Sequence, residues 1–350
     1  KTSLIESRLI TGDAGLFGQF QQRLEARCVR NHVGNYLQMR IGDQDARRVK
    51  FGNTALLQEP NIKNGCGGLR DYQNLLWMTH FKYGAHTLAQ LEAQEMVRPK
   101  NRRQLEVGHD FLLRTRNELH LQTKRLADDI PKALQPKIAW QLGYKDRSPA
   151  RRLEAFMRDL YTHMRTIHLI TRMVERRLAL RPKPARRLPS LRSFFGGGKK
   201  TETLDGFNII DGELVPISPR IFKDQPRRLM RVFLHAQQRG LEFHPDLTQL
   251  LRDNVSLVDD DFVHDTENHE TFLEILNQRG NVAPALRAMH EVDLLGRYIP
   301  EFGRMTCLVQ HEFFHAYAAD EHTLVCLERL DQVWDASQPP FAHYTHILQD

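Results

Sequence analysis

A glycine-rich stretch between two cations is the first place where residue types and spacing suggest chemistry. The run Asn64-Gly65-Cys66-Gly67-Gly68 leads into a segment, from Tyr72 onward, whose apolar residues recur at helical spacing. The first N–H groups of a helix have no intrahelical partner and carry a partial positive charge, so such a junction can receive a phosphate. No Gly-Lys-Ser/Thr sequence follows and no βαβ strand precedes the run. The pattern is therefore neither a Walker loop nor a dinucleotide-binding fingerprint.

Two interpretations of this stretch stay open on the residues alone. In the first, glycines that permit close backbone approach and two flanking cations contact ligand phosphates. These residues are Lys63, Gly65, Gly67, Gly68 and Arg70. In the second, the glycines only let the chain double back. Asp71 would cap the helix or form an ion pair.

Three histidines near the C-terminal end form the densest group of potential metal ligands. His311 and His315 lie four residues apart, so they would share one face of a helix, and His322 falls further along. Hydrolytic metal sites need imidazole and carboxylate ligands that converge from several helices. Without such partners, the simpler interpretation is that these histidines lie on a helix surface.

The elements that must position these residues are mostly helical. Apolar periodicity predicts two helices within 3–27, the second capped by Asp13, and long helices over 103–123 and 151–180. Breaks fall at 135–137 and 143–144. Further helices are predicted over 229–239, 247–253, 269–278, 283–294 and 312–330.

One segment predicts strands. Residues 207–217 form two short apolar runs around Asp211-Gly212, which is typical of a β-hairpin. The proline- and glycine-containing stretch 181–205 before it predicts a flexible connection. The predicted fold is therefore mainly α, a helical bundle with a short β-hairpin insertion.

Composition narrows the class of protein. The 350 residues are 41% hydrophobic and 27% charged, enough for a substantial core, and no apolar run is long enough to span a bilayer. Four separated cysteines predict neither a disulfide framework nor a zinc knuckle, which favours a cytoplasmic location. The net charge of +7 permits an anionic partner, but the aromatic residues of the basic segment fall at core spacing, so nucleic acid is not expected. The start, without Met or signal sequence, favours a piece of a longer chain.

Several motifs resemble one family. Residues 59–73, Glu-Pro-Asn-Ile-Lys-Asn-Gly-Cys-Gly-Gly-Leu-Arg-Asp-Tyr-Gln, closely resemble the signature of the bifunctional PII uridylyltransferase/uridylyl-removing enzymes. Residues 297–304, followed by 310–317 and 320–323, resemble that family's entry into its HD phosphohydrolase domain. Residues 2–13 are similar to the end of its nucleotidyltransferase domain.

The resemblance implies a domain order. Residues 1–50 would be the C-terminal end of the nucleotidyltransferase domain, 51–305 a helical linker domain, and 306–350 the truncated start of the HD domain with its first helix. The parent enzyme would transfer UMP from UTP to a tyrosine of the PII signalling protein, and would hydrolyse it off again under glutamine control. Glutamine would act through a region outside this chain.

The resemblance also implies site residues and cofactors. Lys63, Gly65, Gly67, Gly68 and Arg70 would lie beside the nucleotide phosphates, and His322 would be a metal ligand with Asp320 or Glu321 nearby. Mg²⁺ or Mn²⁺ would assist both reactions, with UTP as substrate. No catalytic site would be complete in this chain, so the segment alone is expected to be inactive.

Two alternatives stay open. A similar Gly-x-Gly-Gly-Ile/Leu-Arg motif occurs in the adenylyltransferases of glutamine synthetase, although the HD-like end disfavours them. The chain could also be a non-catalytic helical scaffold that binds PII or RNA.

Overall fold

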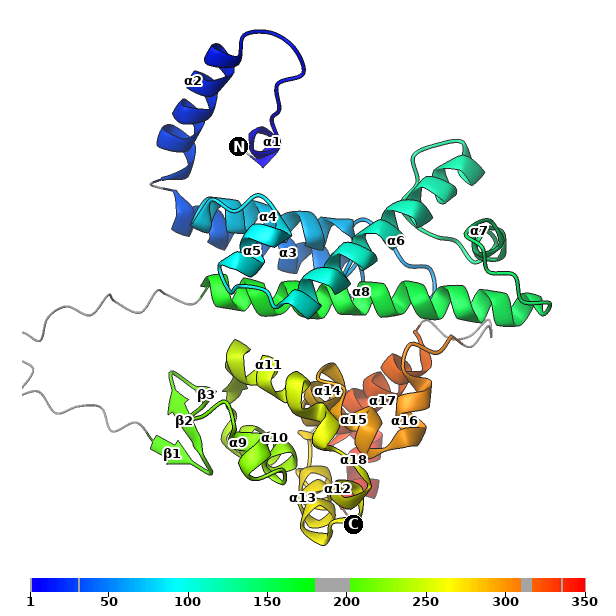
Figure 1. The fold of residues 1–350 in the computed structure, drawn as a ribbon. Coiled ribbons are helices and arrows are strands. Elements are labelled where there is room, and N and C mark those ends of the chain that lie inside the picture. The colour runs from blue at the N-terminus through cyan, green and yellow to red at the C-terminus, as the bar shows by residue number, and fades with distance from the viewer. Residues whose placement is uncertain (1, 31, 180–201, 310–316, 335, 350) are drawn as a thin grey trace, which may run out of the picture. The chain divides into compact units, whose positions relative to one another are not determined.

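The computed structural model describes residues 2–30, 32–179, 202–309, 317–334 and 336–349 (Figure 1). The chain divides into two compact units, Lys1–Lys183 and Pro184–Asp350. Both are mainly helical, and a small sheet lies in the second, so the predicted fold class is confirmed. No helix among the described residues is long and apolar enough to cross a membrane.

The first unit is a helical bundle built along one long helix. Its elements are α1 (Thr2–Ile5), α2 (Ala14–Leu24), a π-helical turn (Glu25–Val29), α3 (Val33–Lys50), α4 (Leu69–Tyr83), α5 (Leu88–Ala93), α6 (Pro99–Thr123), α7 (Gln135–Gln141) and α8 (Pro149–Ala179). Helices α3, α4, α6 and α7 all pack on α8, the long green helix of Figure 1. As predicted, Asp13 caps α2, and its side chain accepts a hydrogen bond from the Leu16 N–H at 2.9 Å.

Helix α8 packs against the other helices of the bundle through a stripe of buried residues that recur at helical spacing. Phe156, Leu160 and Ile167 are fully buried on this stripe. The stripe also buries Tyr161, whose hydroxyl donates to the Leu57 carbonyl at 2.7 Å. Because a buried hydroxyl without a partner would cost free energy, this bond fixes the loop before α4 against α8.

The predictions and the structure differ in two places in this unit. No helix is predicted between the helices within 3–27 and the segment that starts at Tyr72, but Val33–Lys50 form α3, whose residues 42–50 carry little apolar signal. The interruption between the two long helices contains the short helix α7. Pro136 is compatible with this helix because it stands in the first turn, where a backbone N–H has no acceptor within the helix.

The second unit combines a small sheet with a layer of helices. The sheet has the order β1 (Glu202–Leu204), β2 (Phe207–Ile210), β3 (Glu213–Pro216), β4 (Glu242–Phe243), with β4 parallel to β3. The predicted hairpin is β2–β3, with Asp211 and Gly212 both at positive φ in the turn. Of the predicted flexible stretch 181–205, residues 181–201 lie outside the described residues. Residues 202–204 form β1, so a strand stands where a flexible connection was predicted.

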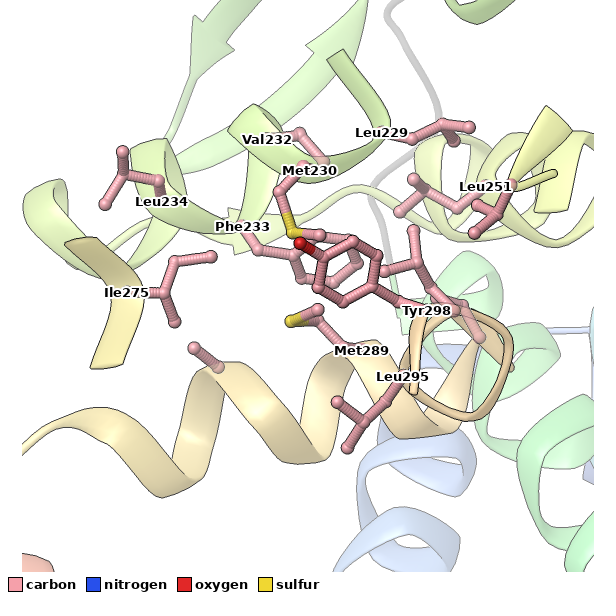
Figure 2. Close-up of a cluster of buried hydrophobic side chains, with 14 of the residues drawn as sticks. Leu229, Met230, Val232, Phe233, Leu234, Leu251, Ile275, Met289, Leu295 and Tyr298 are labelled. Atoms are coloured by element: carbon pink, nitrogen blue, oxygen red, sulfur yellow. The ribbon is translucent and has the colours of Figure 1, made fainter. Parts of the chain in front are cut away.

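The helices of the second unit enclose one core. They are α9 (Ile221–Asp224), α10 (Arg228–Arg239), α11 (Pro245–Asn254), a 3₁₀ turn (Val255–Leu257), α12 (Asp260–His264), α13 (Thr266–Leu276), α14 (Val282–Glu291), α15 (Leu294–Tyr298), α16 (Pro300–Met305), α17 (Ala319–Val333) and α18 (Ala342–Gln349). Figure 2 shows Met230 and Phe233 of α10 meeting Met289 of α14 and the ring of Tyr298. The fully and largely buried residues of this core lie between Phe207 and Leu324. The assignment of 1–50, 51–305 and 306–350 to three functional domains stays a prediction.

Candidate functional site

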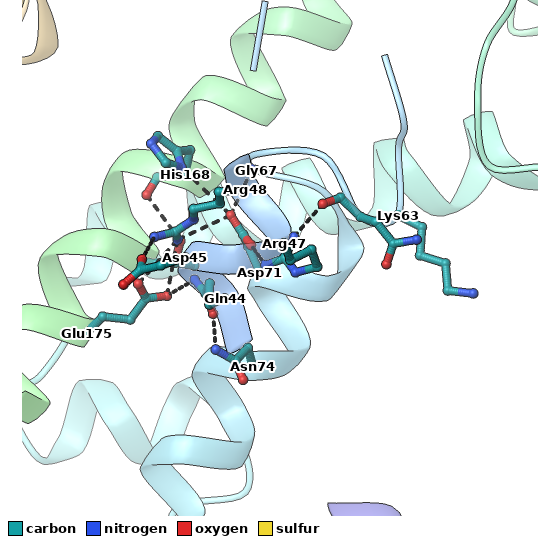
Figure 3. A network of polar contacts seen from close by, with 12 residues as sticks. Gln44, Asp45, Arg47, Arg48, Lys63, Gly67, Asp71, Asn74, His168 and Glu175 are labelled. Carbon is teal, nitrogen blue, oxygen red and sulfur yellow. Dashed lines mark hydrogen bonds and ion pairs between the residues drawn. The ribbon is translucent and has the colours of Figure 1, made fainter. Parts of the chain in front are cut away.

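The carboxylate of Asp71, in the first turn of α4, lies at the centre of a buried ionic network (Figure 3). Its side chain is fully buried and contacts the guanidinium groups of Arg47 and Arg48 on α3. It also accepts a hydrogen bond from the Gly67 N–H at 2.8 Å. Burial alone would raise the pKa of Asp71, but His168 and the two guanidinium groups outweigh it and hold this pKa below its usual range. Asp71 is therefore an ion-pairing residue, one of the roles predicted for it.

Glu175 of α8 is the second carboxylate of the network. Its Oε2 atom lies 3.2 Å from Arg48 Nη2, and its Oε1 atom accepts from the Gln44 amide. Gln44 in turn accepts from the amide of Asn74, whose Oδ1 atom accepts from Arg40 Nε at 2.6 Å. Burial raises the pKa of Glu175 to about 7 against the attraction of Arg48. A hydrogen-bonded chain thus joins α8, α3 and α4 (Figure 3).

The glycine-rich loop uses its backbone N–H groups internally. The N–H groups of Lys63 and Asn64 donate to the Asn61 side chain, and that of Gly65 donates to the Asn61 carbonyl. Those of Gly68, Leu69, Arg70 and Asp71 donate to carbonyls of the same loop. In this conformation the loop therefore offers few free N–H groups to an anion.

The glycines themselves are required by close packing. A Cβ on Gly67, which has φ +70°, would lie 1.7 Å from the Met164 carbonyl oxygen of α8. A Cβ on Gly65 or Gly68 would lie 2.6 or 2.8 Å from carbonyl oxygens of the loop. The loop thus lies directly against α8 at Gly67, where a side chain would force it away, whereas a side chain at Gly65 or Gly68 would distort the loop itself.

The two flanking cations have different surroundings. Lys63 Nζ lies 3.5 Å from the Asp128 carboxylate. Arg70 lies with its guanidinium carbon 5.3 Å from the centre of the Trp77 ring. Among the described residues it forms no hydrogen bond or salt bridge with a protein group.

Arg70 faces a pocket of about 520 Å³. The pocket is lined by charged, amide and indole side chains from the α1 end, α3 and α4, namely Glu6, Arg40, Asp43, Gln44, Arg47, Arg70 and Trp77. Of the predicted phosphate-contacting residues, the structure brings only Arg70 into this lining. It adds two arginines that sequence reasoning missed, Arg40 and Arg47.

A signal for the missed residues was present. Arg40, Gln44 and Arg47 recur at helical spacing directly after the apolar pair Tyr36-Leu37. Their common face is polar, so an analysis that follows apolar residues does not detect it. The buried Gln44 and Arg48 side chains identify it as an inward face.

The predicted metal ligand His322 lies exposed in the first turns of α17. Its Nδ1 atom is 3.7 Å from the Cys326 thiol. Asp320 is buried, with its carboxylate 3.2 Å from His290 Nε2, and Glu321 pairs with Arg287 at 3.0 Å. Within the described ranges, no three His, Cys, Asp or Glu side chains gather to hold a metal ion. His311 and His315 lie outside the described residues.

Comparison with known proteins places both units in one class, the uridylyltransferases. The family model described as GlnD PII-uridylyltransferase matches residues 35–175, which include the ionic network, and the model described as uridylyltransferase GlnD third domain matches 207–298. The chain belongs to the GlnD PII-uridylyltransferase family.

Two curated relatives align with most of this chain. Both are named bifunctional uridylyltransferase/uridylyl-removing enzyme. That of Ruegeria pomeroyi is 31% identical and that of Azospirillum brasilense 30%, each over 95% of this chain. The chain spans only 36% of either relative's length. No solved structure matches the chain.

Proposed function

We propose that this chain is an internal part of an enzyme that transfers UMP from UTP to a tyrosine of PII and hydrolyses it off again. The observation that carries the proposal is the match of two uridylyltransferase family models, in order, to its two units. In the transfer, the tyrosine oxygen attacks the α-phosphorus of UTP, pyrophosphate leaves, and the hydroxyl proton passes to a base or to solvent. The alternatives are not favoured, because both relatives carry the uridylyltransferase name.

The first unit would serve the transfer reaction. Its phosphate-contacting residues are predicted to be Lys63, Gly65, Gly67, Gly68 and Arg70. Support comes from Arg70, whose side chain lines a pocket beside two further arginines. Gly67 would also let the loop approach α8 closely, so that Arg70 reaches the pocket.

The second unit would lead into the site that removes UMP, with His322 as a metal ligand and glutamine as effector through another region of the enzyme. Mg²⁺ or Mn²⁺ would assist both reactions in the cytoplasm. The described residues do not form a complete metal site by themselves, because no three suitable side chains come together, so the other ligands would lie outside them.

The direct test uses a full-length enzyme that contains this chain. Incubated with PII, labelled UTP and Mg²⁺ or Mn²⁺, it should label PII, and glutamine should promote release of the label. The 350-residue chain alone should transfer none. Phosphoryl transfer depends strongly on metal ions that offset the developing charge, and the described residues contain no group of ligands that would hold them. A full-length enzyme that leaves PII unlabelled contradicts the proposal.

A further inference from the structure

The arginine-lined pocket of the first unit has a composition that suits a small anion. Three of its seven lining residues are arginines, and none is aliphatic. A guanidinium group presents its N–H donors as a planar fork that matches the oxygens of a phosphate group. At about 520 Å³, the pocket has the size of a small-molecule site.

The pocket's cations are held in place before any ligand arrives. The Trp77 indole N–H donates to Glu6 Oε1 at 2.8 Å, which fixes the ring. Arg40 and Arg70 lie against this ring, with guanidinium carbons 5.1 and 5.3 Å from its centre. Arg40 also donates through Nε to Asn74. Binding of an anion would therefore immobilise little additional side-chain freedom.

The positive charges of the pocket lie close enough to repel one another. Burial, together with the neighbouring Arg40 and Arg47, lowers the pKa of Arg70. Two carboxylates also line the pocket. Asp43 lies 3.4 Å from Arg40, but its side chain is 60% exposed and that of Arg40 only 15%, so solvent weakens this pair. Glu6 is exposed as well. An anion would thus relieve repulsion that these carboxylates offset only in part.

The third arginine contributes from a fixed position. Arg47 donates to the Asn64 carbonyl and contacts the buried carboxylate of Asp71. These contacts link the pocket to the glycine-rich loop on one side and to the ionic network on the other (Figure 3). Replacing Arg47 would therefore disturb the fold, so it is not the residue with which to test the pocket.

We propose that this pocket binds a chain of phosphate groups, as in a nucleoside triphosphate or inorganic triphosphate, through Arg40, Arg47 and Arg70. The inference deepens the proposed function and rests on it for the identity of the triphosphate as that of UTP. It assigns Arg40 and Arg47 of α3 to the ligand together with Arg70. Recognition is by charge, and the pocket requires no contact with the nucleoside.

Calorimetric titration of the 350-residue chain tests the site directly, with inorganic triphosphate, UTP and uridine as probes. Triphosphate and UTP should bind with similar affinity and compete, while uridine should give no signal. Arg40→Gln and Arg70→Gln should each weaken binding by about tenfold or more. Arg103→Gln, at an exposed position of α6, is the matched control and should bind as the unaltered chain does.

Several results would overturn the proposal. They are triphosphate binding that does not saturate, triphosphate binding unaffected by both substitutions in protein of unchanged circular dichroism, and uridine binding equal to that of UTP. The full-length enzyme then separates the two proposals. If Arg40→Gln and Arg70→Gln abolish triphosphate binding to the chain but leave the KM for UTP unchanged, the pocket stands and its assignment to UTP is wrong. If the unaltered enzyme fails to transfer UMP although the chain binds triphosphate, only the proposed function is contradicted.

Discussion

Arg48 and Glu175 form a buried ion pair across 127 residues of sequence, with Arg48 Nη2 3.2 Å from Glu175 Oε2. The pair joins α3 to the C-terminal part of α8. Since Arg48 also contacts Asp71 of α4, one guanidinium group links three helices of the bundle. The pocket arginines Arg40 and Arg47 project from the same helix as Arg48. The pair thus helps to set where those arginines stand.

The first prediction is that the protonation of Glu175 makes the free energy of unfolding depend on pH. Its pKa is raised from 4.5 to about 7 in the folded protein, so between these values the folded state holds a proton that the unfolded state has released. The free energy of unfolding should therefore fall as the pH rises through this window, with a contribution of at most about 1.4 kcal/mol per pH unit. Above about pH 7 this contribution becomes constant.

Glu175→Gln removes the titrating group and should flatten the stability profile. Urea unfolding at pH 5, 6, 7 and 8 measures the difference between the unaltered and altered chains. Glu154→Gln, on the exposed side of the same helix, controls for the loss of one carboxylate and should leave the slope between pH 5 and 7 unchanged. Equal slopes for the unaltered chain and Glu175→Gln would contradict the assigned shift.

The second prediction concerns Asp71. Its replacement by Ala leaves Arg47 and Arg48 without their shared carboxylate, and removal of one partner from a buried charge network typically costs about 3–5 kcal/mol. Thermal unfolding should show a clear drop in Tm. Asp110→Ala, at a carboxylate 70% exposed on α6, should change stability by no more than about 0.5 kcal/mol. Similar losses for both variants would show that the network is not a stabilising centre.

The elements of this fold were predictable to different degrees. Apolar periodicity found α6, α8 and the longer helices of the second unit, namely α10, α11, α13, α14 and α17, because each presents a buried apolar stripe, whereas the short helices between them were missed. The Asp211-Gly212 turn gave the hairpin. Helix α3 was not predicted, and over 42–50 the signal is weakest because the inward residues Gln44 and Arg48 are polar and are stabilised by partners far away in sequence. Periodicity of apolar residues carries no information on such partners.

The candidate site shows the same limit. Arg70 was named from the glycine-rich motif, and it lies in a pocket. The role of Gly67 could not be seen, because it depends on the approach of Met164 from a helix about a hundred positions later. Arg40 and Trp77 could be found only once the helices that carry them were placed side by side.

The third prediction concerns Gly67 and the packing of the glycine-rich loop against α8. Gly67→Ala would set a Cβ 1.7 Å from the Met164 carbonyl oxygen at a φ that disfavours any side chain, so the loop must leave α8. We expect a large loss of stability and a loss of triphosphate binding in protein that stays folded at low temperature. Gly18→Ala in α2 meets no atom within 4 Å and should be neutral or stabilising by up to about 1 kcal/mol. Full stability of Gly67→Ala in chemical unfolding would contradict the close approach of loop and helix.

The last prediction concerns His322 and separates the two activities proposed for the full-length enzyme. His322 lies exposed near the start of α17 in the second unit, whereas the arginine pocket belongs entirely to the first. If His322 ligates the metal of the UMP-removing site, His322→Ala should abolish removal of UMP from uridylylated PII, because one lost imidazole weakens a metal site severely. Transfer of UMP to PII should stay within about twofold, since it does not use this residue. His264→Ala, at an exposed histidine of α12 whose ring hydrogen-bonds to a backbone carbonyl of its own helix, is the matched control and should retain both activities. Removal of UMP at the unaltered rate by the His322→Ala enzyme, assayed with Mn²⁺ and glutamine, would return His322 to its alternative role as an ordinary residue of the helix surface.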